Sequence, residues 1–258
     1  MNVTRILQLF FILITVTGPL LAQNQRTELN KDASLAVAAT ESGVKLEKAG
    51  RHKEAVEEFE LAIRLNPGFA VAFNNLGVTY NSLSRYEDAI KVLTTALRLS
   101  PDYADAHYNI GVAFNKLRQS RQAIKAYEDA VRIKPTFVPA YIGLGAVYED
   151  DGQYKSAITF YRQALRIDPN DAEAYNNLGT AQSRSGRNKE AIENLERSIK
   201  LKPDLAEARY NLGVVALRAR RREIALQQYT VLTSLNSVLA FKLYGGIYQG
   251  KVLLLHTQ

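Results

Sequence analysis

The sequence predicts an all-α chain built as a solenoid of stacked helix–turn–helix repeats, and three observations support this fold. Prolines recur at a constant spacing of 34 residues, glycine and alanine recur in fixed columns between them, and large apolar residues recur at helical spacing beside these columns. A constant period of this length is the signature of a repeat array, in which one supersecondary unit is copied and stacked. The evenly spaced prolines are Pro67, Pro101, Pro135, Pro169 and Pro203.

Numbering each proline as position 32 defines six predicted repeats, which span residues 36–69, 70–103, 104–137, 138–171, 172–205 and 206–239. Position 8 is always glycine: Gly43, Gly77, Gly111, Gly145, Gly179 and Gly213. Position 20 is always alanine: Ala55, Ala89, Ala123, Ala157, Ala191 and Ala225. Position 24 is always large: Phe59, Leu93, Tyr127, Tyr161, Leu195 and Tyr229.

These columns describe two packed helices in each repeat. Small residues let helix backbones approach closely, and large residues fill the space beside them. Gly50, Gly152 and Gly186 at position 15 indicate a tight turn between the two helices. The proline ends the second helix, and the residue after it is of a type that favours helix N-caps, so we expect it to begin the next helix.

The pattern resembles the tetratricopeptide repeat, a 34-residue helix–turn–helix unit, over residues 36–239. This resemblance implies a right-handed superhelix whose concave face is lined by the first helix of each repeat. Members of the family commonly bind extended peptides or helices on that face, and curved solenoids in general present such surfaces.

The two ends of the array depart from the pattern, as terminal repeats do when they have a neighbour on one side only. In the sixth repeat, Leu232 and Ser237 replace the small residue and the proline. Residues 240–258 are predicted to form a capping helix and a tail. An aromatic stripe of Phe241, Tyr244 and Tyr248 is expected to cover the end of the sixth repeat, and the apolar residues 252–255 either fold back on the array or contact a partner.

Residues 1–22 have the layout of a secretory signal peptide. Arg5 precedes an apolar stretch, Gly18 and Pro19 follow it, and Ala22 is a small residue at a candidate cleavage site. The chain is therefore predicted to be exported, to the periplasm or outside the cell. The alternative is an anchor left in the membrane by residues 6–22, a span of 17 uncharged residues. The polar residues 23–35 are predicted to be a linker.

Composition excludes several kinds of chemistry. The chain has no cysteine, which rules out disulfides, thiolate catalysis and cysteine metal sites. Its 258 residues carry a net charge of +7, too small a surplus to indicate nucleic-acid binding. The three histidines share no metal-ligand spacing, and the glycines are not clustered as in a phosphate-binding loop. We therefore expect no catalytic residues, metal or cofactor.

The candidate peptide-binding residues are asparagines and tyrosines at positions 5 and 6. An asparagine side chain offers both a donor and an acceptor, so it can pair with the backbone of any bound peptide. This row is similar to the asparagine ladder in the repeats of the O-linked N-acetylglucosamine transferases. The alternative is that the asparagines hydrogen-bond between helices of the array. The residues are Asn74, Asn75, Tyr108, Asn109, Asn176, Asn177, Tyr210 and Asn211.

A basic surface cluster falls at the turn of the sixth repeat, where it is either a solvated surface or a contact for an acidic partner. It consists of Arg218, Arg220, Arg221 and Arg222.

The features together predict an exported, non-enzymatic scaffold that binds a peptide or protein segment, with cell-envelope assembly as a setting. The alternative is an accessory subunit that recruits substrate for a separate enzyme acting on glycans or the envelope. Both predict a protein partner and no nucleic acid, and the sequence leaves the oligomeric state open.

Overall fold

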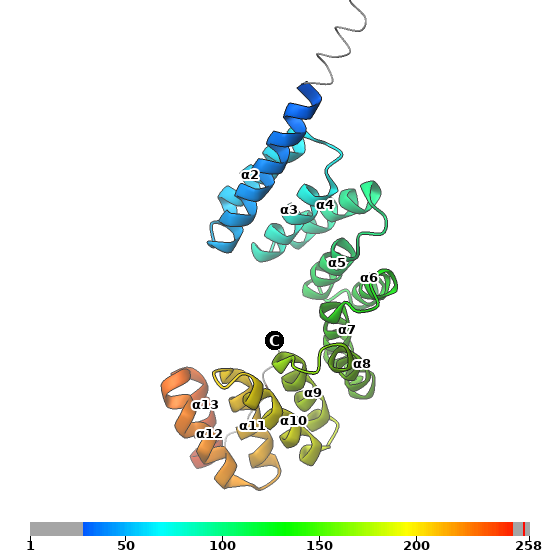
Figure 1. Ribbon diagram of the computed structural model, residues 1–258. Coiled ribbons are helices and arrows are strands. Elements are labelled where there is room, and N and C mark those ends of the chain that lie inside the picture. The colour runs from blue at the N-terminus through cyan, green and yellow to red at the C-terminus, as the bar shows by residue number, and fades with distance from the viewer. Residues whose placement is uncertain (1–27, 250–254, 256–258) are drawn as a thin grey trace, which may run out of the picture. The chain divides into compact units, whose positions relative to one another are not determined.

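The computed structural model describes residues 28–249 and residue 255, and every regular element in these residues is an α-helix (Figure 1). The chain divides into two compact units, residues 1–109 and residues 110–258, with the boundary inside helix α5. The predicted all-α repeat fold is confirmed.

Unit 1 contains a helix over residues 28–48 and then consecutive antiparallel helices. These are α2 (His52–Leu65), α3 (Ala70–Ser82), α4 (Tyr86–Leu99) and the first part of α5 (Ala104–Lys116). A small apolar core of Ala36, Ala39, Ala62 and Ala72 joins the helix over residues 28–48 to α2 and α3.

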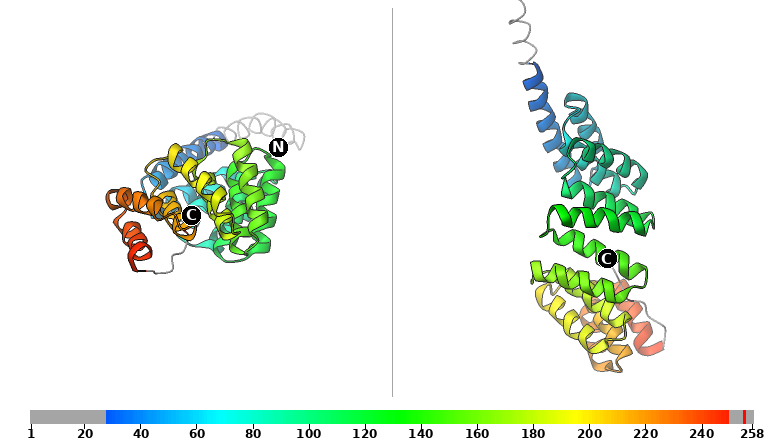
Figure 2. Two further views of the ribbon diagram at one scale, coloured as in Figure 1. Left: turned by 90° about the horizontal axis from the view of Figure 1, so that it is seen from below. Right: turned by 90° about the vertical axis from the view of Figure 1, so that its right-hand side faces the viewer.

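Unit 2 continues the same pattern from the second part of α5, and each helix from α6 onward packs against the next one (Figure 2). Its further helices are α6 (Ser120–Ile133), α7 (Val138–Asp150), α8 (Tyr154–Ile167), α9 (Ala172–Arg184), α10 (Asn188–Leu201), α11 (Ala206–Arg218), α12 (Arg222–Leu235) and α13 (Ser237–Gln249). Helices α3, α5, α7, α9 and α11 each begin at the first position of a predicted repeat.

The glycine column marks the closest approach between the two helices of a repeat. A Cβ added to Gly77 would lie 2.4 Å from Leu93 Cγ, and one added to Gly145 would lie 2.4 Å from Tyr161 Cε1. Real Cβ atoms do not come so close to carbon, so these positions exclude a side chain unless the large residue moves. The alanine column is fully buried in all six repeats.

The turn inside each repeat uses a left-handed residue at position 15. Gly50, Gly152 and Gly186 have φ values of +73°, +73° and +85°, as their predicted role requires. The other three repeats keep the same backbone without glycine, because Ser84, Arg118 and Arg220 each have φ of 59°. The turn is therefore set by the packing of the two helices, and glycine only lowers the conformational strain of the left-handed residue.

The expected N-caps are wrong. The residue after each proline lies in a two-residue turn before the helix, and the N-cap positions are held by later residues such as Phe69, Phe137 and Leu205. Asp171 does cap α9, because its side chain accepts a hydrogen bond of 2.9 Å from the backbone nitrogen of Ala174. The turn separates successive repeats and sets where the next helix begins.

Residues 28–35 of the expected linker are helical and continue into the first helix of repeat one. They are rich in residues that favour helices, and Leu29 and Leu35 are exposed within the described part of the chain. Residues 23–27 of the expected linker, and the whole of the predicted signal peptide, lie outside the described residues.

Helix α13 closes the end of unit 2, as predicted, but with a different face. Leu243 takes the place over Gly213 that a position-24 residue holds in the other repeats, and a Cβ at Gly213 would lie 2.6 Å from Leu243 Cδ2. Leu239, Leu243 and Ile247 are buried at a spacing of four residues, while Phe241, Tyr244 and Tyr248 of the predicted aromatic stripe are exposed. The chain carries two apolar stripes here, and the aliphatic one fits the narrow gap beside the glycine.

Leu255 is buried in the apolar cluster formed by α10 to α13. This contact supports the prediction that the apolar tail folds back on the array at this residue. Residues 250–254 lie outside the described part of the chain.

Candidate peptide-binding site

The predicted groove residues of unit 1 are joined by side-chain amides. Asn109 Nδ2 on α5 donates to Asn74 Oδ1 on α3 at 2.9 Å, and Asn74 Nδ2 lies 3.4 Å from Asn75 Oδ1. Asn74 is buried, whereas Asn75, Tyr108 and Asn109 are half-buried. The amides therefore connect the first helices of repeats two and three.

The same arrangement occurs in unit 2, between α9 and α11. Asn211 Nδ2 donates to Asn176 Oδ1 at 2.9 Å, and Asn176 Nδ2 donates to Asn177 Oδ1 at 3.2 Å. All three asparagines are buried, and so is Tyr210. Two matching amide pairs between neighbouring repeats support the helix-to-helix role of these asparagines, because each such bond satisfies buried polar atoms. Their role in peptide binding stays a prediction.

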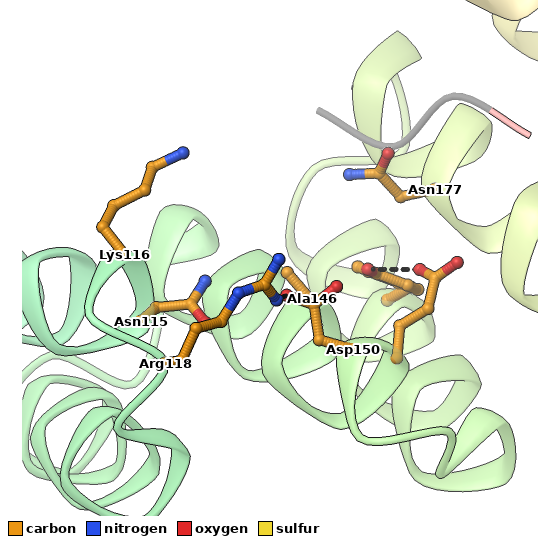
Figure 3. Close-up of a pocket in the computed structure, with 8 residues that line it drawn as sticks. Asn115, Lys116, Arg118, Ala146, Asp150 and Asn177 are labelled. Carbon is orange, nitrogen blue, oxygen red and sulfur yellow. Dashed lines mark hydrogen bonds and ion pairs between the residues drawn. The ribbon is translucent and has the colours of Figure 1, made fainter.

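One predicted residue, Asn177, also lines a cavity of about 250 Å³ on unit 2 (Figure 3). We call this cavity the polar pocket. Three successive repeats form it, since its walls come from the end of α5 and the following turn, from α7 and α8, and from α9. Its lining residues are Asn115, Lys116, Arg118, Ala146, Glu149, Asp150, Tyr161 and Asn177.

A buried carboxylate, that of Glu149, lies at the wall of the polar pocket. Only 2% of this residue is exposed. The Tyr161 hydroxyl donates to Glu149 Oε2 at 2.9 Å, and the Thr180 hydroxyl donates to Oε1 at 3.3 Å. Arg184 Nη1 lies 3.4 Å from Oε1. The carboxylate is thus held by α8 and α9, and it ties repeat four to repeat five.

Burial raises the pKa of the Glu149 carboxyl above its ordinary value, although Arg184 and the hydroxyls of Tyr161 and Thr180 oppose the shift. Burial also raises the pKa of the Tyr161 hydroxyl well above its usual value, and the nearby Glu149 carboxylate adds to the effect. At neutral pH the tyrosine is therefore a hydrogen-bond donor to this carboxyl.

The mouth of the polar pocket is charged. Arg118 Nη1 pairs with Asp150 Oδ2 at 2.8 Å. Lys116 is exposed and has no ion pair with any described residue. Asn115 and Asn177 add amide groups, and an amide can pair with both the N–H and the C=O of a peptide. The pocket therefore offers donors, acceptors and one available cation within a small volume.

Sequence reasoning missed Glu149 and the position-15 arginine, Arg118. Position 12 is asparagine in repeats two and three, as Asn81 and Asn115, and repeat four carries Glu149 at the same position. That column was the available signal. Burial of its carboxylate could not be read from the sequence, because it depends on Tyr161, Thr180 and Arg184 from later helices.

The predicted basic cluster is exposed at the turn between α11 and α12. Arg222 Cζ lies 5.3 Å from the centroid of the Tyr248 ring, which links the cluster to α13. Among residues 28–249, no group of histidine, aspartate or glutamate side chains is arranged to hold a metal ion. In the same residues, no helix is long and apolar enough to cross a membrane.

The raised pKa of Glu149 predicts a pH-dependent effect of replacing it. A carboxyl whose pKa is higher in the folded chain binds its proton more tightly there, so its contribution to stability is greatest below the unfolded pKa and falls as pH rises through the folded pKa. Glu149→Gln replaces the carboxyl with an amide that does not titrate, so the variant does not lose this contribution to stability as the pH rises. We expect the stability of the variant, relative to the parent, to increase from acidic to neutral pH, as measured by urea unfolding at several pH values.

Glu196→Gln, which removes an exposed carboxylate from α10, serves as the control for the change in net charge. A difference between Glu149→Gln and the parent that is the same at every pH would show that the carboxyl is not perturbed by folding.

Family models and solved structures agree on the nature of the repeats. Models described as tetratricopeptide repeat or TPR repeat match residues 45–69, 58–91, 79–117, 104–137, 140–204 and 176–233. Together these matches run without a gap from residue 45 to 137 and from residue 140 to 233. No curated protein matches the chain.

Three solved structures illustrate the similarity. The chain is 25% identical to MamA, with a TM-score of 0.55 and coverage of 67% of this chain and 94% of MamA. It is 24% identical to a thermophilic TPR protein of Thermus thermophilus, with a TM-score of 0.62 and coverage of 70% and 99%. It is 23% identical to YrrB, described as a TPR protein with an unusual peptide-binding site, with a TM-score of 0.54 and coverage of 77% and 97%.

The second and third of these likenesses show the fold alone. Taken with the family models and the glycine, alanine and turn columns of the structure, they lead to one conclusion. This chain belongs to the tetratricopeptide repeat family.

Proposed function

We propose that the chain is a non-enzymatic scaffold that binds a peptide or protein segment, and that the polar pocket is a binding site. The observation that carries this proposal is the pocket itself, which three successive repeats build from amide, carboxylate and cationic side chains. An enclosed recess with a few convergent polar groups is the usual form of a binding site. YrrB, which shares the fold, is described as having a peptide-binding site.

The chemistry of the polar pocket fits an extended peptide. The amides of Asn115 and Asn177 can pair with its backbone, and Lys116 can pair with a carboxylate, either on a side chain or at a C-terminus. Glu149 is held by hydrogen bonds from Tyr161 and Thr180, so it forms a fixed part of the pocket wall. A bound segment would therefore meet groups that are already in position, which lowers the cost of binding.

Peptide selection tests this proposal. A random dodecapeptide display library is selected on the purified full chain, and the affinities of the selected peptides are measured for variants. We expect Asn115→Ala combined with Lys116→Ala to weaken a class of these peptides by on the order of tenfold.

Lys125→Ala combined with Asn170→Ala is the matched control, since both residues lie elsewhere on unit 2, outside the lining of the polar pocket. Equal losses in the two double variants, or no loss in either, would show that the polar pocket does not bind peptides.

We also propose that residues 1–22 direct export and are removed, with an uncleaved membrane anchor as the alternative. The support is the order of Arg5, the apolar stretch and Ala22. N-terminal sequencing of the protein from its native host is expected to find Gln23 as the first residue. A start at Met1 in a soluble fraction would refute export, and a start at Met1 in membranes would indicate the anchor.

A further inference from the structure

We infer that the outer face of α12 and α13 is a second docking surface, which binds an acidic protein segment through a large apolar side chain. This inference rests on the proposed function as a protein scaffold, but it concerns a different surface from the polar pocket. We call the surface the aromatic face and define it by Tyr229, Phe241, Tyr244 and Tyr248, with the adjoining basic cluster.

The aromatic face is the side of α13 that the array leaves uncovered. Burial of Leu239, Leu243 and Ile247 against α11 and α12 turns the aromatic side chains outward. Phe241 is 71% exposed, Tyr248 51% and Val238 62%. Adjacent exposed apolar residues of this size mark interaction sites in folded proteins.

The aromatic face contains a cavity of about 330 Å³, which is large enough for one large apolar side chain. Its lining residues are Tyr229, Thr233, Ser237, Ala240, Phe241 and Tyr244. The Tyr244 ring centroid lies 5.9 Å from that of Tyr229 and 4.7 Å from that of Tyr248. These ring contacts hold the tyrosines in place, so the wall of the cavity exists before a ligand arrives.

The charge next to the aromatic face is strongly positive. Arg222 lies over the Tyr248 ring, and Arg220 and Arg221 are exposed beside it. Residues 206–249 carry six basic side chains and two acidic ones, Glu207 and Glu223. A partner with carboxylates near its apolar side chain complements this charge.

Two features favour a protein segment over a bilayer or a nucleic acid. The apolar groups line a recess with the hydroxyl-bearing residues Thr233 and Ser237, which suits a single inserted side chain better than a flat lipid surface. The cations gather at one end, because Lys242 is the only one after Arg222 in α12 and α13. A nucleic acid carries a charge at every nucleotide and needs cations along its whole path.

The experiment uses the same random dodecapeptide library on the purified full chain. Selected peptides that bind the aromatic face are expected to combine a large apolar residue with several aspartates or glutamates. Phe241→Ser is expected to weaken them by on the order of tenfold. A triple variant, Arg220→Gln, Arg221→Gln and Arg222→Gln, is expected to weaken them similarly and to reduce the salt dependence of binding.

Each variant has a matched control elsewhere in the array. Leu29→Ser also removes an exposed apolar side chain, and its exposed fraction of 69% is close to that of Phe241. Arg64→Gln, Arg98→Gln and Arg121→Gln together remove three exposed arginines. Both controls are expected to leave the affinity within about twofold of the parent.

Several results would overturn the inference. One is a set of peptides that loses affinity in the Asn115 and Lys116 double variant but not in Phe241→Ser, which would leave the polar pocket as the binding site. Another is that the chain binds phosphatidylglycerol vesicles or oligo(dT) but no peptides, and that Phe241→Ser abolishes this binding. A third is self-association, detected by light scattering, that Phe241→Ser abolishes. Failure to select any peptide would contradict both the aromatic face and the polar pocket.

Discussion

The fold depends on one contact, in which a large residue of the second helix lies against a glycine of the first. Leu93 over Gly77 and Tyr161 over Gly145 are two examples, and neither glycine has room for a Cβ. This close approach brings the two helices of a repeat together and leaves their other faces to pack against neighbouring repeats. The last repeat has the same kind of contact with a residue from a different helix, because Leu243 of α13 covers Gly213. The contact therefore determines how the array ends as well as how it is built.

The repeat register could be predicted because it rests on local columns that recur every 34 residues. The repeat boundaries at which α3, α5, α7, α9 and α11 begin and the tight turns at the three glycines followed from those columns. Two errors have a shared cause. The outward aromatic stripe of α13 and the helical residues 28–35 lie at the two ends of the repeat pattern, and the periodicity of the columns contains no information about packing beyond the last repeat.

The candidate site was only partly predictable. Asparagines at positions 5 and 6 were recognised as a row, but their hydrogen bonds to one another depend on the spacing of successive helices. Asn177 lies in the polar pocket, while the buried carboxylate of Glu149 and the left-handed Arg118 were not expected. A surface assembled from three repeats has properties that no single repeat carries. For that reason sequence columns describe the scaffold well and its binding chemistry less well.

A double-mutant cycle on Gly77 and Leu93 tests the central contact most directly. Gly77→Ala alone forces a methyl group against Leu93, and Leu93→Ala alone leaves a cavity that costs about 2–5 kcal/mol. In the double variant the new methyl occupies part of that cavity. Urea unfolding should therefore show the double variant to be more stable than the sum of the single effects, by about 0.5–3 kcal/mol. Additive effects would contradict the account, because they would mean that the two residues do not compete for the same space.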